Sequence, residues 1–129
     1  MKHYLLLILT LLLSTTLKAQ KADVFIPIGK YIQLGDSEKL SAWFADNLEL
    51  NILGEINDCS KIQATQIIKD FFIKYKPKHF EIIHKSGKIP MKYAVATLNA
   101  GGERFRMTLF VKIQTSGNEI LQIRIARIE

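Results

Sequence analysis

Six side chains could line a pocket and act on a molecule bound there. A tyrosine hydroxyl can donate a hydrogen bond to an oxygen atom, and a histidine can exchange a proton near neutral pH. An asparagine amide cannot take the proton that a general base must accept. The candidates are the tyrosines Tyr31 and Tyr93, the polar residues Asn51 and His84, and the apolar residues Trp43 and Met107. This set suits binding of a small apolar ligand better than catalysis, so we predict no catalytic residue and no cofactor.

The other reactive side chains add no further chemistry. Cys59 is the only cysteine, which excludes a disulfide within the chain. We expect either a small buried side chain there or a thiol that pairs between two chains. His79 and His84 are five residues apart on a predicted strand and should therefore point to opposite faces. Because this spacing does not suit metal ligands, no metal site is predicted.

The C-terminal third of the chain is predicted to form four β-strands. Apolar and polar residues alternate in four runs between residues 80 and 128, and turns that contain Gly or Asn separate the runs. The third run is the clearest case. Its apolar face holds Phe105, Met107, Leu109, Val111 and Ile113, and its polar face holds Arg104, Arg106, Thr108, Lys112 and Gln114. In the fourth run Ile120 and Ile128 fall on the polar side. Sequential antiparallel hairpins are the simplest topology.

The residues that precede these four strands are predicted to form helices that cover the sheet. Apolar residues recur at helical spacing over residues 22–34, and Gly35 ends that helix. Asp36 and Ser37 cap a short helix that includes Trp43 and Phe44 in its apolar stripe, and a third helix spans residues 64–75. Between the second and third helices, residues 48–52 and 58–61 are predicted strands. The fold class is therefore α+β, with three helices on the N-terminal side of a curved, mainly antiparallel sheet.

The N-terminus has the pattern of an export signal. A basic start precedes an apolar run over residues 4–13, which is too short to cross a bilayer. Cleavage is expected after Ala19, so residues 1–19 are the predicted signal and residues 20–129 a single periplasmic or secreted domain. Lys18 beside the cleavage point leaves an uncleaved N-terminal anchor as the alternative.

The charge balance of the chain is mildly basic. The 18 Lys and Arg residues exceed the 12 Asp and Glu residues, a net charge of +6, and removal of Lys2 and Lys18 with the signal lowers this to +4. One stretch holds six lysines and a single acidic residue, Glu81; the lysines are Lys74, Lys76, Lys78, Lys85, Lys88 and Lys92. They could attract an anionic surface such as lipid head groups, or could keep a helix end and an edge hairpin solvated. No interleaving of Arg with aromatic residues indicates nucleic acid.

The order of elements and the run GDSEKLSAWFAD at residues 35–46 resemble the second helix and following strand of the nuclear transport factor 2-like superfamily. With its leader, the chain is similar to an uncharacterised family of small exported bacterial proteins with that fold. The resemblance covers residues 22–129. It implies the cone-shaped, cystatin-like α+β fold that ketosteroid isomerases share. Because this fold hosts enzymes, carriers and assembly modules, the resemblance decides no activity.

The resemblance to ketosteroid isomerases also gives roles to individual positions. Tyr31 stands where those enzymes carry a tyrosine that stabilises an oxyanion, although its spacing to Gly35 is shorter here. Asn51 stands where they present a carboxylate base. Glu49 is the nearest carboxylate, but strand alternation places it opposite Leu48 and therefore outside. The resemblance thus implies a cavity and one hydroxyl donor without the base.

Two classes of function follow. The first is a non-catalytic module that binds a small ligand or another protein, and the alternative is an isomerase-like or dehydratase-like enzyme that uses Tyr31 and His84 on a small apolar or carbonyl substrate. Related folds often pair through the outer sheet face, which implies a homodimer here. The interface candidates are Arg104, Arg106 and Phe110, although Phe110 could equally be a scattered surface residue.

Overall fold

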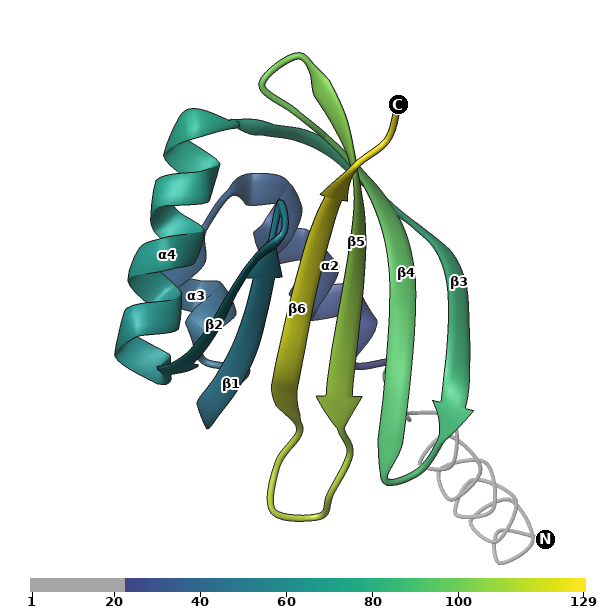
Figure 1. Cartoon of the computed structure of the whole chain (residues 1–129). Helices are drawn as coiled ribbons and strands as arrows, with labels where there is room; N and C mark the ends of the chain where they lie inside the picture. The colour runs from purple at the N-terminus through teal and green to yellow at the C-terminus, as the bar shows by residue number, and fades with distance from the viewer. Residues whose placement is uncertain (1–22) are drawn as a thin grey trace, which may run out of the picture.

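A computed structural model describes residues 23–129, and the predicted signal at residues 1–19 lies outside them (Figure 1). The helices and strands follow the predicted order. They are α2 (Phe25–Leu34), α3 (Ser37–Ser41), β1 (Phe44–Ile52), β2 (Glu55–Ser60), α4 (Lys61–Lys74), β3 (Pro77–Lys88), β4 (Met91–Ala100), β5 (Glu103–Lys112) and β6 (Glu119–Arg127). The α+β class is confirmed. Only α2 and α3 precede the sheet, however, because α4 lies between β2 and β3 in the chain.

All six strands form one mixed sheet in the order β2-β1-β6-β5-β4-β3. Strands β3 to β6 are the predicted antiparallel meander, and β1 pairs antiparallel with β2. The remaining contact, in which β1 pairs parallel with β6, was not predicted from the sequence. This contact joins the N-terminal half of the domain to the end of the chain and leaves β2 and β3 as the two sheet edges (Figure 1).

Turn and capping residues set the ends of the helices, and two of them, Gly35 and Asp36, were predicted from the sequence. Gly35 adopts a left-handed conformation with φ of 67° and ends α2. The carboxylate of Asp36 accepts a hydrogen bond of 3.0 Å from the Lys39 backbone N–H and so caps α3. Ser60 and Gln63 form a capping box at the start of α4, three residues before the predicted start.

The second helix is shorter than predicted. It ends at Ser41, and Phe44 is already the first residue of β1. The carbonyl of Trp43 accepts a hydrogen bond of 2.6 Å from the backbone N–H of Ile120. Pairing with β6 therefore takes Trp43 and Phe44 out of the predicted helical stripe.

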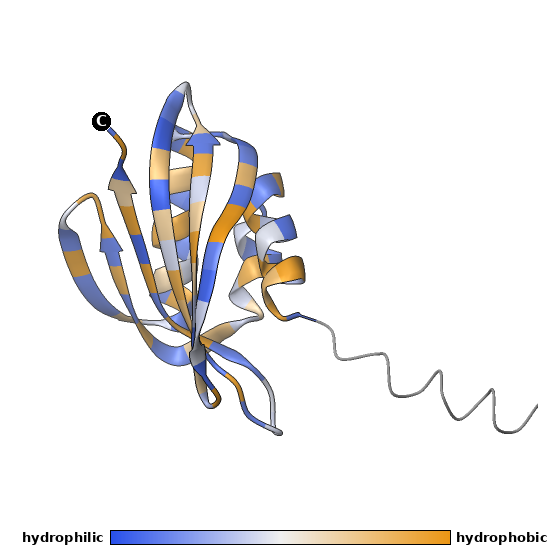
Figure 2. Cartoon of the chain, turned by 90° about the vertical axis from the view of Figure 1, so that its right-hand side faces the viewer, coloured by the Kyte–Doolittle hydropathy of each residue, from blue (hydrophilic) through white to orange (hydrophobic). Residues whose placement is uncertain are grey.

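The core lies between the helices and one face of the sheet, here called the inner face. Apolar and polar residues alternate along the strands, as the banded ribbons of Figure 2 show. The inner face of β5 buries Phe105, Met107, Leu109 and Val111, and that of β4 buries Ala94, Ala96, Leu98 and Ala100. Helix α2 contributes Ile28 and Ile32, and helix α4 contributes Ile68, Phe71 and Phe72. The inner face is thus packed with side chains contributed by both layers.

Two bulges change the face on which residues lie. The pairing of β3 with β4 shifts between Ile82 and His84, so His84 lies opposite Val95 on the outer face, the same face as His79. The prediction that His79 and His84 point to opposite faces is therefore wrong. A similar shift where β5 pairs with β6 places Ile120 on the inner face, fully buried, although simple alternation put it on the polar side.

Within residues 23–129, no helix is both long and apolar enough to cross a membrane.

We expect Phe72→Ala to lower the free energy of unfolding by about 3–5 kcal/mol, because a large buried side chain leaves a cavity. Phe72 is 5% exposed and its ring centroid lies 6.1 Å from that of Phe71. The matched control is Ile62→Ala on the same helix, where the side chain is 82% exposed. That change should alter stability by less than about 0.5 kcal/mol. Urea unfolding measures both, and a loss below about 1 kcal/mol for Phe72→Ala would contradict the packing of α4.

Candidate functional site

The six predicted pocket residues do not share one site. Met107 is 0% exposed in the core of the inner face. Tyr31 on α2 and Trp43 before β1 are half-buried against the same core from the helix side. The other three, Asn51, His84 and Tyr93, lie on the outer face of the sheet, opposite residues of their neighbouring strands. The sheet itself therefore separates Tyr31 from Asn51 and His84.

Strand parity explains why Asn51 is not where the resemblance placed it. Asn51 is two residues from Glu49, so both point to the outer face, while Leu50 between them is fully buried. The ring of Tyr31 lies at the surface of the helix layer, with the Lys30 and Lys39 ammonium groups 5.9 and 6.0 Å from its centroid. The hydroxyl donor and the amide are therefore not aimed at a common molecule.

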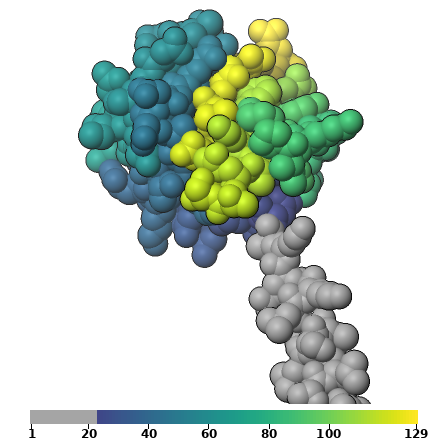
Figure 3. Space-filling model, turned by 90° about the horizontal axis from the view of Figure 1, so that it is seen from below, coloured from purple at the N-terminus to yellow at the C-terminus, as the bar shows by residue number. Residues whose placement is uncertain are grey.

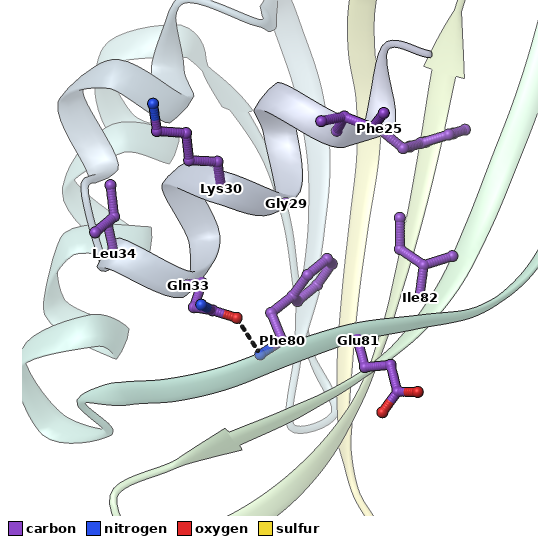
Figure 4. Close-up of a pocket in the computed structure, with 9 residues that line it drawn as sticks. Phe25, Gly29, Lys30, Gln33, Leu34, Phe80, Glu81 and Ile82 are labelled. Carbon is purple, nitrogen blue, oxygen red and sulfur yellow. Dashed lines mark hydrogen bonds between the residues drawn. The ribbon is translucent and has the colours of Figure 1, made fainter.

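A shallow groove of about 510 Å³ runs between α2 and the edge strand β3 (Figure 4). The side chain of Gln33 reaches across it and accepts a hydrogen bond of 3.0 Å from the Phe80 backbone N–H. The Phe80 ring lies directly against Gly29, where a Cβ atom would be only 2.9 Å from a ring carbon. Ile26, which is 70% exposed, lines the outer part of the groove. The charged side chains that line the groove are those of Lys30 and Glu81.

A second hollow, of about 620 Å³, lies at the end of the sheet and is called the rim pocket below. Figure 3 looks onto this end, where the β5–β6 loop (yellow-green), the β3–β4 hairpin (green) and the start of α2 (purple) meet. Its lining residues are Asp23, Val24, Phe25, Lys85, Ser86, Gly87, Ile89, Lys92, Ile113 and Asn118. None of them belongs to the predicted pocket set. These residues are far apart in the sequence and follow no regular spacing. The available sequence signal was the pair of turn residues Gly87 and Asn118, which predicted the loops that bring the lining residues together.

An ion pair lies at the wall of the rim pocket. The Lys85 ammonium bonds the Asp23 carboxylate, which also accepts a hydrogen bond of 2.9 Å from the Phe25 backbone N–H. Partial burial by itself would raise the pKa of Asp23, but the Lys85 hydrogen bond, the Phe25 N–H and the charge of Lys92 together lower that pKa below its ordinary value. Asp23 is therefore ionised at neutral pH and neutralises one of the two pocket lysines.

The outer face of the sheet carries an ordered row of side chains, called the aromatic row. In register across the strands it runs Asp58, Glu49, Gln122, Phe110, Tyr93 and Ser86. The ring centroids of Tyr93 and Phe110 are 5.7 Å apart, and the His84 ring follows 6.0 Å from Tyr93. Arg104 and Arg106 share this face. Phe110 is therefore part of an aromatic pair, which the sequence did not reveal because the two residues are on different strands.

The lysine-rich stretch does not form one patch. Lys74, Lys76 and Lys78 lie where α4 ends and β3 begins, whereas Lys85, Lys88 and Lys92 lie at the β3–β4 hairpin. Lys78 and Lys88 are ten residues apart on one strand, which separates them by about 33 Å. The fold therefore divides the six lysines between the two ends of the sheet.

Cys59 is buried on β2, and its Sγ contacts the Leu48 carbonyl oxygen at 3.6 Å. Burial, with a smaller contribution from the charge of Asp58, raises the pKa of its thiol. Since the thiolate is the reactive form, this cysteine is a poor nucleophile at neutral pH. Among residues 23–129 there is also no cluster of three side chains able to hold a metal ion.

This architecture, helices on one face of a curved mixed sheet, is the nuclear transport factor 2-like fold. An NTF-2 like protein of unknown function from Silicibacter pomeroyi has it, with a TM-score of 0.61, 16% identity, and 81% of this chain and 89% of that chain covered. Residues 25–126 match the family described as "Domain of unknown function (DUF4783)", and the chain belongs to this family.

Crystal structures of family proteins resemble the chain over nearly their whole length. One from Bacteroides uniformis is 21% identical, with a TM-score of 0.78 and coverage of 83% of this chain and 99% of that one. One from Bacteroides ovatus is 26% identical, with a TM-score of 0.77 and coverage of 86% and 99%. No curated protein matches the sequence. The family membership therefore establishes the fold and carries no activity with it.

We expect neither the wild type nor Asn51→Asp to isomerise a steroid enone. Proton transfer beside a carbonyl needs a base at the carbon and a donor at the oxygen of one bound molecule. A carboxylate at position 51 would project from the outer face, on the other side of the sheet from Tyr31. The absorbance of the conjugated product measures turnover. Activity that appears in Asn51→Asp and is lost on adding Tyr31→Phe would contradict this arrangement.

Proposed function

We propose that the domain is a non-catalytic protein-interaction module whose outer sheet face binds a second copy of the chain. The observation that supports this most directly is the Tyr93–Phe110 pair on a sheet face that no helix of residues 23–129 covers. The helices lie together on the other side of the sheet (Figure 1). A pair of large rings with one face toward solvent is typical of an interface centre.

The residues around the pair also suit an interface. Val95 and Thr108 lie opposite each other beside the rings, and both are half-buried. Arg106 and Arg124 border them on the same face. Aromatic residues and arginine are among the types most enriched where proteins meet. Aromatic rings contribute a large contact area with few lost rotamers, and the planar guanidinium of arginine contributes several hydrogen-bond donors.

The charges of this face favour a second copy as the occupant. Near the aromatic row, the β1–β2 side carries Glu49 and Asp58, and β3 carries Lys88 at its hairpin end, whereas Glu81 lies further along β3 on the same face. A twofold axis parallel to the strands places the β1–β2 side of one copy over the β3–β4 side of the other. The acidic end of each aromatic row would then face the basic edge of its partner, with the rings between them.

An enzyme that uses Tyr31 and His84 is not proposed, because these residues lie on opposite sides of the sheet. The arrangement instead suits recognition through surfaces.

We expect the wild type to sediment as a dimer at tens of micromolar and Phe110→Glu to sediment as a monomer. The substitution buries a charge against the partner's rings, so it should weaken association by about 100-fold or more. Sedimentation velocity measures both species.

The control for this experiment is Ile62→Glu, which makes the same kind of change at an exposed position on α4 and should leave the dimer intact. A wild type that is monomeric at these concentrations would rule out the dimer. A dimer that Ile62→Glu dissociates and Phe110→Glu does not would place the interface on the helix layer instead.

We also propose that the domain works outside the cytoplasm, after removal of residues 1–19. The support is the basic, apolar and small-residue order of the leader. Intact mass of the protein recovered from an exporting host should correspond to a chain that begins at or near Gln20. A mass that retains the leader would favour the uncleaved anchor.

A further inference from the structure

We infer that the rim pocket is a binding site for an amphiphilic carboxylate, an anion with a short apolar body. The head group would bind the Lys92 ammonium, and the body would lie along the apolar wall that Ile89 and Ile113 form. This site is separate from the outer face of the sheet, so a ligand could bind there whether or not the domain pairs.

The size and walls of the pocket suit such a ligand. Its volume of about 620 Å³ falls in the range of small-molecule sites. Val24 and Phe25 form its floor and are themselves buried, whereas Ile89 at its lip is 68% exposed. When an apolar ligand covers a large aliphatic side chain that was exposed to water, the burial of apolar surface favours binding.

The charge of the pocket selects an anionic head. Lys85 is bonded to Asp23, whereas Lys92 forms no ion pair with any residue of the described part of the chain. Lys92 is itself a lining residue of the pocket, and in register it lies opposite Val111, which is buried on the inner face. The lining therefore carries one net positive charge, together with the polar side chains of Ser86 and Asn118.

Two other anionic ligands fit less well. A free inorganic anion would satisfy Lys92 but leave the Ile89 and Ile113 surfaces in water. A membrane surface would be bound best by many lysines in one plane. Lys74, Lys76 and Lys78 lie at the opposite end of the sheet from the rim pocket, so they cannot join Lys92 in such a plane. A ligand with one charge and an apolar body satisfies both parts of the pocket at once.

The first test uses the protein as the exporting host processes it, titrated with decanoate below its micelle concentration at physiological salt. Amide chemical shifts should change saturably at Gly87, Ile113 and Asn118 and remain unchanged at Gly54, on the distant β1–β2 turn. Decanol and decyltrimethylammonium have the same body with a neutral and a cationic head. Each should bind at least about fivefold more weakly, because the interaction with a partly exposed lysine is modest.

The second test distinguishes the effect of Lys92 on binding from the effect of the overall positive charge at this end of the sheet. Lys92→Gln should weaken decanoate binding by about fivefold, and Ile89→Ser by a similar factor. The matched control is Lys112→Gln, which removes the same charge near the same end of the sheet but from its outer face. It should change the affinity by less than about twofold because solvent screens it. Dispersed amide spectra of each variant show that it has folded.

Several results would overturn the inference. They are an absence of saturable shifts with decanoate, equal binding of the cationic probe, and equal effects of Lys92→Gln and Lys112→Gln. Binding to vesicles that contain phosphatidylglycerol, without any shift caused by monomeric decanoate, would also overturn it and assign this end of the domain to a membrane surface. The first two comparisons need no variant, so an unfolded variant would not leave the inference untested.

Discussion

The parallel pairing of β1 with β6 is the contact on which the rest of the domain depends. It joins Phe44 to Ile120 and Leu50 to Ile123, so a strand from the first half of the chain completes a sheet formed by the second half. Because α2, α3 and α4 are connected to β1 and β2 by short segments, this pairing also brings all three helices to one face of the sheet. The same contact leaves the other face without a helix. The division into a packed inner face and an open outer face thus has one physical origin.

Small residues let the two layers approach closely. Helix α2 carries Gly29, against which the Phe80 ring packs, and the inner face of β4 carries Ala94, Ala96 and Ala100. At the other end, the guanidinium of Arg127 donates a hydrogen bond of 2.7 Å to the Tyr75 hydroxyl and so ties the end of β6 to the end of α4. With the interior filled in this way, polar chemistry is confined to the surface and the rim. The candidate sites within residues 23–129 are accordingly a groove, a rim pocket and a sheet face.

Family membership establishes the fold of this domain, whereas its function has to be inferred from the chemistry of its side chains. The match to DUF4783 and the related crystal structures define the fold, and this fold accommodates many unrelated activities. The function of the domain therefore depends on particular side chains. We propose contact with another protein from the paired rings of Tyr93 and Phe110, and an anionic ligand with an apolar body from Lys92 beside Ile89 and Ile113. The two surfaces are on different parts of the molecule, and a domain can use both.

The sequence by itself determined the class of fold, the order of the elements and the faces of the regular strands. Local rules are enough for these features: period-two alternation in β5, the Gly35 end of α2 and the capping residue Asp36 all act over a few positions. Only the tertiary structure decided the candidate sites. A single bulge moved His84 to the outer face, and pairing between distant strands brought Tyr93 to Phe110. Asn51 is the exception, because the alternation that places Glu49 on the outer face places Asn51 there too. The rim pocket likewise combines residues from Asp23 to Asn118. Such contacts depend on register between segments far apart in the chain, and the free energy that fixes that register comes from the packing of the whole core, which no short stretch of sequence contains.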